Sequence, residues 1–179
     1  MSKIFNLEYG VFNMDNDNKL KAFLDSLSFR DLTITVELLI TGYILYFYAT
    51  ELLSASTVMR ADPSWVSGLL LKVIVISIIV SIAGRALLAF VSDDNVDKPL
   101  DERQRFIALA GLKPAYWVLQ SGVCIAIFQY TAEAHGWPQG ATIAVPFLAL
   151  HILVVSFLLA ELVGYGTQLV QAHKGASYG

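Results

Sequence analysis

The sequence has little of what small soluble enzymes and secreted domains depend on. A single cysteine, Cys124, stands among 179 residues, which excludes an internal disulfide framework and a multi-cysteine metal site. Charged residues make up only 15% of the chain, against about 25% in soluble domains. The net charge is −3, so the basic surface that nucleic-acid binding requires is missing, and we predict no direct nucleic-acid partner.

Motifs that carry catalysis or hold a metal or cofactor are also lacking. No serine or cysteine stands in a nucleophile elbow, and the glycines form no phosphate-binding loop. Asp93, Asn95 and Asp97 have the spacing of a calcium loop. Lys98 replaces its required glycine, however, and Gln104 replaces its closing glutamate. We therefore predict a protein that is not an enzyme and that holds no cofactor or metal.

Apolar sequence is what the chain has in abundance. Hydrophobic residues make up 56% of it, and the mean hydropathy is +0.60. Four stretches reach the roughly 20 mostly apolar residues that a membrane-spanning helix needs, at about 32–53, 66–91, 114–132 and 141–170. Backbone polar groups in lipid have to be satisfied within one segment, so each stretch is expected to be helical. The predicted fold is an all-α integral membrane protein with four transmembrane helices in two antiparallel hairpins.

The part before the first span has a different character. Residues 1–31 are predicted to form a cytoplasmic arm, and residues 32–179 the transmembrane domain. The arm lacks the apolar core and the cleavage site of a signal peptide, so the first span is expected to direct insertion. Apolar residues recur at helical spacing between Leu20 and Leu27, which predicts a short helix on the cytoplasmic leaflet.

Basic residues are unevenly distributed among the connections. The arm and the connection between the second and third spans hold most of them: Lys3, Lys19, Lys21, Arg30, Lys98, Arg103, Arg105 and Lys113. The first connection holds only Arg60, and the third holds none. Because short connections rich in lysine and arginine stay in the cytoplasm, we expect both termini and the middle connection to be cytoplasmic.

Two glutamates lie inside the first span. A charged side chain at the bilayer centre costs roughly 2.5–3.5 kcal/mol, so Glu37 and Glu51 need partners. Their spacing places both on one helical face, which also holds Thr41, Ile44 and Tyr48. We expect this polar face to lie against the other helices.

The second span supplies cations at matching depths. If it runs antiparallel to the first span, Arg85 lies level with Glu37, and Lys72 lies level with Glu51. We predict these two ion pairs. The alternative is that Lys72 and Arg85 extend separately toward opposite membrane surfaces.

The fourth span carries His151 and Glu161. Protonatable residues at this depth mark proton or ion pathways in transporters. Glu161 lies in the inner half and is also a competing partner for Arg85. In the alternative interpretation, a neutral His151 is hydrogen-bonded to the third span. The candidate partners there are Gln120, Ser121 and Cys124. Further along the fourth span, Gly164 and Gly166 are expected to permit close helix approach.

The segment "DERQRFIALAGLKPAYW" begins at Asp101 and separates the second and third spans. Asp101 and Gln104 have the spacing of a capping box, and Glu102 adds negative charge to the first turn. This predicts a short amphipathic helix on the cytoplasmic surface. Gly111 and Pro114 are expected to break or bend the path before the third span.

The same segment carries two arginines. We expect Arg103 and Arg105 to reach anionic lipid headgroups or acidic residues of the arm. An acid–base role for Asp101 and Glu102 would need a facing pocket, and the sequence indicates none.

Two segments of the chain resemble a known family. "DERQRFIALAGLKPAYWVL" and "AELVGYGTQLV" are similar to motifs of small bacterial four-span membrane proteins that are classed as a domain of unknown function. The matching residues are Asp101, Glu102, Arg103, Tyr116, Ala160, Glu161, Leu162, Tyr165 and Gly166. The resemblance implies a multi-pass protein of the bacterial inner membrane. It implies no activity, although the family's frequent proximity to helix-turn-helix regulators implies a sensor or anchor role.

Two functions are compatible with these patterns. The leading hypothesis is a regulatory or assembly subunit that binds partners through Asp101, Glu102, Arg103 and Arg105. Its expected partners are membrane lipids, including anionic headgroups, and a protein or a second copy of the chain. The alternative is a small proton- or cation-coupled transporter that uses Glu37, Arg85, His151 and Glu161. A water-filled, two-sided or alternating cavity that reaches both His151 and Glu161 would favour the transporter, and a dry, tightly packed centre would exclude it.

Overall fold

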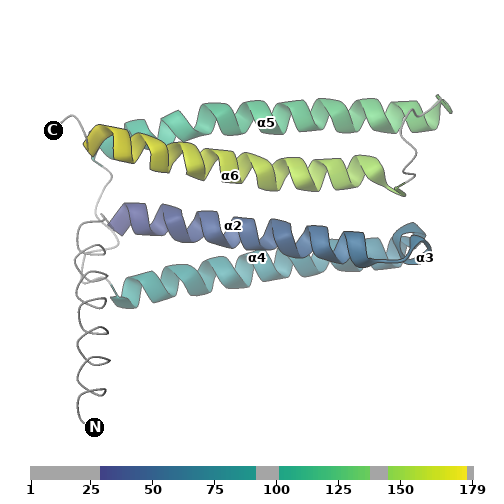
Figure 1. Cartoon of the computed structure of the whole chain (residues 1–179), viewed down its shortest axis with the longest axis horizontal. Helices are drawn as coiled ribbons and strands as arrows, with labels where there is room; N and C mark the ends of the chain where they lie inside the picture. The colour runs from purple at the N-terminus through teal and green to yellow at the C-terminus, as the bar shows by residue number, and fades with distance from the viewer. Residues whose placement is uncertain (1–28, 92–100, 138–144, 177–179) are drawn as a thin grey trace, which may run out of the picture.

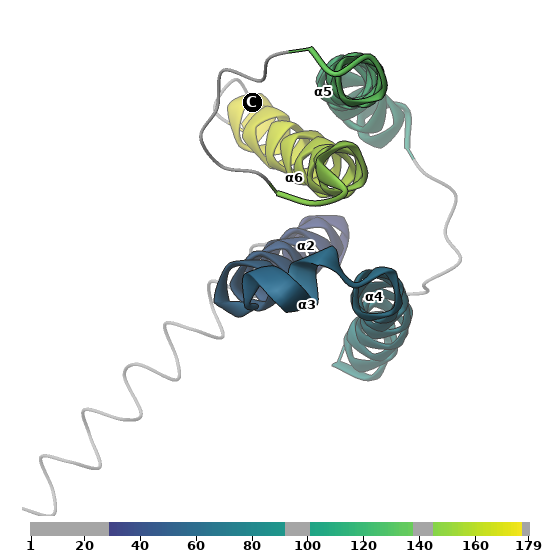
Figure 2. The same ribbon diagram turned by 90° about the vertical axis from the view of Figure 1, so that its right-hand side faces the viewer.

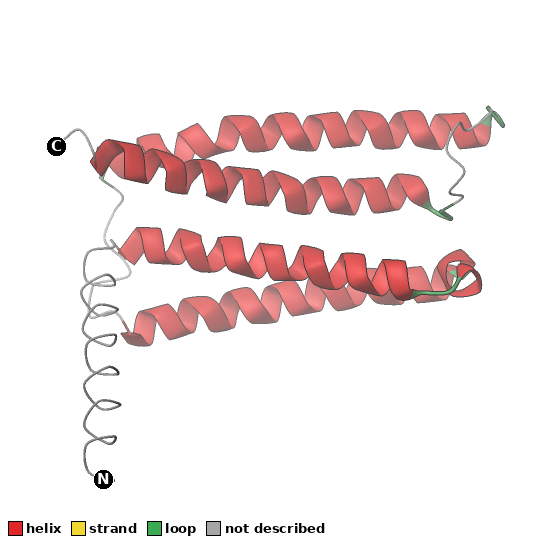
Figure 3. Cartoon of the chain, viewed as in Figure 1, coloured by secondary structure: helices red, strands yellow, loops and turns green. Residues whose placement is uncertain are grey.

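A computed structural model describes residues 29–91, 101–137 and 145–176. All regular structure in these ranges is helical, as predicted (Figures 1 and 3). The helices are α2 (Phe29–Ser54), α3 (Thr57–Ala61), α4 (Pro63–Val91), α5 (Glu102–Ala134) and α6 (Leu148–Ala176). The short helix expected between Leu20 and Leu27 lies outside the described residues.

Three of these helices are long and apolar enough to cross a membrane. Their candidate spans are Arg30–Ser54 in α2, Pro63–Ala86 in α4 and Leu148–Lys174 in α6. α5 is also long enough, but its sequence is too polar to meet the same standard. The prediction of a membrane protein is supported by three helices rather than by the predicted four.

The four long helices form an open arc. α5 packs along α6, α6 along α2, and α2 along α4. Among the described residues, no contact of similar extent joins α4 to α5, and Figure 2 shows the resulting gap in the circle. Neighbours in the arc run in opposite directions (Figure 1). α2 and α5 therefore begin at one end of the molecule, which we call the Asp101 end. The opposite end is the Ser54 end.

Four of the five residues predicted for the polar face of α2 lie at the centre of the molecule, and the fifth, Glu51, is partly exposed. Glu37, Thr41, Ile44 and Tyr48 are buried, and Tyr48 is fully enclosed. Ile44 and Tyr48 also belong to the hydrophobic core, which lies where α2 meets its two neighbours. Its buried members are Ile40, Ile44 and Tyr48 of α2, Leu69 and Val73 of α4, and Leu158 of α6. α2 thus contributes buried residues toward both α4 and α6.

Small residues set the spacing of α5 and α6. A Cβ atom on Gly111 would lie 2.5 Å from the carbonyl oxygen of Gly164, and one on Gly122 would collide with the side chain of Ser156. The close approach predicted for Gly164 is confirmed, because small side chains let helix backbones meet. Gly166 makes no such approach to the described helices of one copy, since a Cβ there would meet nothing within 4 Å.

A break or a bend was expected before the third span, and no break is present. α5 is one helix of 33 residues with Pro114 inside it. Proline removes one backbone hydrogen bond, but packing against a neighbouring helix holds such a helix together. Gly111 serves that packing rather than ending the helix, because it is buried against Gly164.

The boundaries near the Ser54 end differ from those predicted. The fourth span was expected to begin at residue 141, but α6 begins at Leu148. Pro146 and Phe147 form a turn, and Phe147 has a φ of 57°, which an α-helix does not accommodate. The short helix α3 was not predicted. The side chain of Ser56 caps it by accepting a hydrogen bond from the Met59 amide.

Candidate functional site

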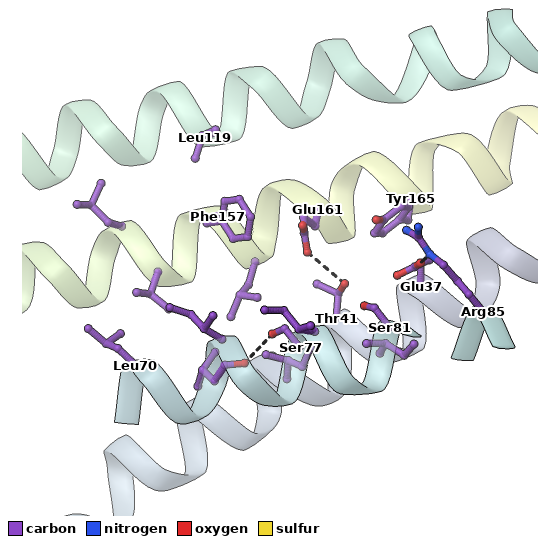
Figure 4. Close-up of a pocket in the computed structure, with 18 residues that line it drawn as sticks. Glu37, Thr41, Leu70, Ser77, Ser81, Arg85, Leu119, Phe157, Glu161 and Tyr165 are labelled. Atoms are coloured by element: carbon purple, nitrogen blue, oxygen red, sulfur yellow. Dashed lines mark hydrogen bonds and ion pairs between the residues drawn. The ribbon is translucent and has the colours of Figure 1, made fainter. Parts of the chain in front are cut away.

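A cavity of about 810 Å³ opens between α2, α4 and α6, on the side where α4 and α5 do not meet (Figure 4). α5 contributes Leu119 to its edge. Most of its lining is apolar. The polar residues of the lining are Glu37, Thr41, Ser77, Ser81, Arg85, Glu161 and Tyr165. Ligand sites in proteins have this size and this mixture of an apolar wall with a few polar groups.

Glu37 and Arg85 form the first polar contact of the cavity. Arg85 Nε donates to Glu37 Oε1 at 2.8 Å, so the predicted inner ion pair is present. Gly84 permits this contact. A Cβ there would come within 3.0 Å of Ile40 and 3.1 Å of Val36, so α4 approaches α2 closely beside Arg85. The pair neutralises a carboxylate that is almost completely buried.

Glu161 forms the second polar contact. Thr41 Oγ1 donates to Glu161 Oε2 at 3.3 Å, and Thr41 lies one helical turn beyond Glu37. The alternative in which Glu161 competes for Arg85 is wrong, because Arg85 bonds to Glu37. Within the described part of the chain, Glu161 makes no ion pair, and its Oε1 accepts no hydrogen bond. One carboxyl oxygen in the cavity is therefore available to a ligand.

Two aromatic rings flank Glu161 on α6. Phe157 precedes it by four residues and Tyr165 follows it by four, so all three lie on one face of the helix (Figure 4). All three also line a smaller cavity of about 290 Å³ between α5 and α6. We call Phe157, Glu161 and Tyr165 the α6 stripe. It separates two hollows and presents a carboxyl group between two rings.

His151 lies outside this cavity and is bound in the interior. Its Nδ1 is hydrogen-bonded to the hydroxyl of Tyr48 on α2 at 2.5 Å, and the exposed fraction is 3% for His151 and 0% for Tyr48. The predicted partners on α5 are wrong. Gln120, Ser121 and Cys124 are exposed, because α5 turns its small residues Gly122 and Ala126 toward α6.

The second predicted ion pair lies nearer the Ser54 end. Lys72 Nζ is 3.7 Å from Glu51 Oε1, and it also lies 5.4 Å from the centre of the Phe47 ring. Both charged side chains are partly exposed, and neither lines the cavity. The pair holds α2 to α4 without taking part in the candidate site.

The residues predicted to form a cytoplasmic interaction surface begin α5. Asp101 and Gln104 form the predicted capping box, in which Asp101 Oδ1 accepts from the Glu102 amide at 2.7 Å. Arg103 Nη2 donates to the Ala172 carbonyl at 3.4 Å, so it reaches the end of α6. Arg105 is exposed. The predicted contacts of Arg103 and Arg105 with lipid headgroups stay a prediction. Their predicted contacts with acidic residues of the arm lie outside the described residues.

Sequence reasoning missed three features of the site. It did not identify the cavity, the pairing of Tyr48 with His151, or the two rings of the α6 stripe. The rings had a signal in the sequence, because an aromatic residue stands four positions before and four after Glu161. The cavity had none, since it arises where two helices distant in sequence fail to meet.

No metal centre emerges from the parts of the chain that the structure describes, where no three histidine, cysteine, aspartate or glutamate residues gather. A scan against protein-family models, a search of curated proteins and a search of solved structures each found no match to the chain. Its function therefore has to be inferred from the geometry of the site.

Proposed function

We propose that the protein is a four-span protein of the bacterial inner membrane that acts as a small proton- or cation-coupled transporter. The observation that carries this proposal is the position of Glu161 in an open cavity at mid-length of its span. Glu161 stands 13 residues after Leu148 and 15 before Ala176. At about 1.5 Å per residue, it lies some 20 Å from either end of α6. A carboxyl group is costly at such a depth, and it marks a pathway when it faces a cavity.

The proposal takes α5 as the fourth span. Its outer side carries large apolar residues that are exposed: Tyr116, Trp117, Ile125, Ile127 and Phe128. Exposed apolar surface of this extent is unusual in a soluble protein and is ordinary in contact with lipid. Membrane helices also associate through small residues, as α5 does with α6 at Gly111 and Gly122.

We place the Asp101 end and both termini in the cytoplasm. α2 begins and α6 ends there, and α5 begins there as well (Figure 1). The connections at this end hold most of the lysines and arginines of the chain. Short segments rich in these residues favour the cytoplasmic side.

His151 has no part in the proposed route. The transporter hypothesis expected a cavity that reaches both His151 and Glu161, and this cavity reaches Glu161 but not His151. Its hydrogen bond with Tyr48 joins α6 to α2. The route therefore depends on Glu161 and on the Glu37–Arg85 pair.

Cysteine accessibility tests the proposal. Cys124 is first replaced by serine, and Ser81→Cys then places one thiol in the cavity lining. In proteoliposomes, we expect a membrane-impermeant maleimide to label this thiol from each side in separate experiments, because a transporter opens its cavity to water on each side in turn, even where the cavity also opens toward lipid. A matched thiol from Ile79→Cys, on the exposed side of α4, should resist the reagent from both sides. Labelling of Ser81→Cys from one side only, or from neither, would contradict a transport pathway.

A second candidate function is partner binding at the Asp101 end. The observation that favours it is an exposed surface in which charges lie beside large apolar residues. Asp101, Glu102, Arg103 and Arg105 are exposed. Phe106 and Leu109 beside them are 69% and 65% exposed. This combination suits a protein partner, a second copy of the chain or anionic lipid.

The partner hypothesis is tested by charge reversal. Arg103 and Arg105 are both replaced by glutamate, and complexes are isolated from native membranes. We expect recovery of partners to fall, because the variant repels an acidic surface or headgroup. The matched control reverses Lys174, which is also exposed and lies at the same end of the molecule. Unchanged recovery after the double reversal would count against the hypothesis.

The resemblance to the four-span family supports the proposed architecture. Its two motifs are distant in sequence, yet their helices pack against each other along α5 and α6. Tyr116 from the first motif lines the smaller cavity together with Ala160, Glu161 and Tyr165 from the second. The family assignment itself stays a proposal.

A further inference from the structure

We infer that the cavity binds lipophilic monovalent cations, with Glu161 as their counter-ion. This inference rests on the proposed function and names its substrate class. It depends on three features of the cavity: its net charge, its aromatic walls and its opening toward lipid.

The charges of the cavity favour a cation. Its described lining holds two carboxyl groups and one guanidinium group, from Glu37, Glu161 and Arg85. When both carboxyl groups are ionised, the formal charge is −1. Arg85 is bound to Glu37 at 2.8 Å, so the excess negative charge lies on Glu161. A ligand with a negatively charged group would be repelled by the two carboxylates. A cation instead gains a counter-ion where water is scarce.

The α6 stripe provides the remaining recognition. Phe157 and Tyr165 lie one turn on either side of Glu161 and line the same cavity. The faces of aromatic rings attract cations, most strongly when the cation has lost its water. A cation with organic substituents would therefore contact rings on two sides and a carboxylate between them. A small hydrated ion would gain little from these walls.

The rest of the lining suits an apolar body. Ile40 and Ile44 of α2, Leu70, Val73, Ile74 and Ile78 of α4, and Leu153 and Leu158 of α6 surround the space beyond the stripe. The cavity also opens between α4 and α5, on a side that faces the hydrocarbon in the proposed orientation. A membrane-soluble cation could enter there without crossing an aqueous surface.

Arg85 offers the cavity a competing site for an anion. Its side chain is 70% exposed and uses only Nε for Glu37, so the other guanidinium nitrogens are available for hydrogen bonding. These donors could instead hold the headgroup of an anionic lipid. The two occupants differ in charge, so the experiment compares probes of equal size and opposite sign.

Tetraphenylphosphonium and tetraphenylborate are the probes, and the full chain is reconstituted in nanodiscs of zwitterionic lipid. Binding is measured by equilibrium dialysis against empty nanodiscs. We expect saturable binding of the phosphonium cation and no binding of the borate anion beyond the empty control. Stronger binding of the borate would overturn the inference and would indicate an anion site at Arg85. Absence of saturable phosphonium binding would overturn it as well.

Variants assign the binding to Glu161. Glu161→Gln keeps an acceptor for Thr41 but removes the charge, and should weaken phosphonium binding by about thirtyfold or more. Glu161→Asp keeps the charge and should stay much closer to the unmodified protein. Glu51→Gln is the matched control, because it removes a carboxylate that does not line the cavity. Equal affinity of Glu161→Gln and the unmodified protein would overturn the inference. Retained binding by Glu161→Asp would show that a change at this position does not prevent folding.

The binding assay and the labelling assay fail independently. Phosphonium binding without two-sided labelling of Ser81→Cys would keep the cation site and contradict transport. Two-sided labelling without phosphonium binding would keep the transporter and contradict its proposed substrate class.

Discussion

Tyr48 on α2 and His151 on α6 are joined by a hydrogen bond of 2.5 Å from the hydroxyl to Nδ1, in a region closed to solvent. Each side chain belongs to the face of its helix that the other helix covers. The bond therefore fixes the register of two helices that are more than 100 residues apart in the sequence.

Tyr48→Phe should destabilise the protein by about 1–3 kcal/mol, because it leaves a buried ring nitrogen without its partner. The free energy of unfolding can be measured by titration with a denaturing detergent. Tyr46→Phe is the matched control. Tyr46 is 67% exposed, and its loss of a hydroxyl should change stability by less than about 0.5 kcal/mol. Equal effects of the two changes would show that the Tyr48 bond contributes nothing.

Arg85→Gln should cost more stability than Lys72→Gln. The first change leaves Glu37, which is buried, without its cation, at a cost of about 1–3 kcal/mol. The second removes a longer, partly exposed contact to Glu51, which is worth about 0–1 kcal/mol. Combining Arg85→Gln with Glu37→Gln should recover part of the loss, since no buried charge is left unpaired. A double variant less stable than Arg85→Gln alone would contradict this account of the pair.

Gly122→Ala should weaken the contact of α5 with α6. The added methyl group collides with Ser156, and overpacking of this kind costs about 1–3 kcal/mol. Gly166→Ala is the control, because its Cβ meets nothing within 4 Å and alanine favours the helix by about 0.5–1 kcal/mol. Thermal unfolding of both variants should therefore shift in opposite directions. A shift in the same direction would mean that α5 and α6 are not packed through Gly122.

Asp101→Ala should loosen the first turn of α5 by about 1 kcal/mol, because the capping box is lost. Hydrogen exchange should accelerate at the amides of residues 102–104 and stay unchanged near Ala126. Glu102→Gln is the comparison, since it removes only charge near the helix dipole and should cost less. Unchanged exchange in Asp101→Ala would indicate that the start of α5 is held by other contacts, such as that of Arg103 with Ala172.

Phosphonium binding should weaken as the pH falls, because a proton on Glu161 removes the net negative charge of the cavity. The other ionisable groups that face the site are Glu37 from α2, Arg85 from α4 and Tyr165 from α6, whereas α5 contributes only Leu119. Glu161→Gln should abolish most of this pH dependence. Equilibrium dialysis over a pH series checks it, and an unchanged slope in the variant would assign the titration to another group.

Features that depend on a single helix, or on two consecutive antiparallel helices, could be predicted from the sequence. The polar face of α2 follows from the spacing of Glu37, Thr41 and Tyr48, and the capping box follows from Asp101 and Gln104. Both ion pairs could also be predicted, because antiparallel helices of similar length place Glu37 opposite Arg85 and Glu51 opposite Lys72.

Features that depend on how helices are arranged around one another could not be predicted. His151 bonds to Tyr48 rather than to α5, because the rotation of α5 is set by Gly122 and Ala126. Pro114 signalled a break, but the backbone contact at Gly111 outweighed that local signal. The cavity follows from the missing contact between α4 and α5, which leaves no periodic pattern in the sequence.

α5 runs without interruption from its capped start at Asp101 to Ala134. Its 33 residues extend about 50 Å, which exceeds the roughly 30 Å thickness of the hydrocarbon. The charged start of this helix and its Gly122 contact with Ser156 belong to one continuous element. Leu119, at the edge of the Glu161 cavity, lies on the same helix, so the Asp101 end and the cavity share one backbone segment.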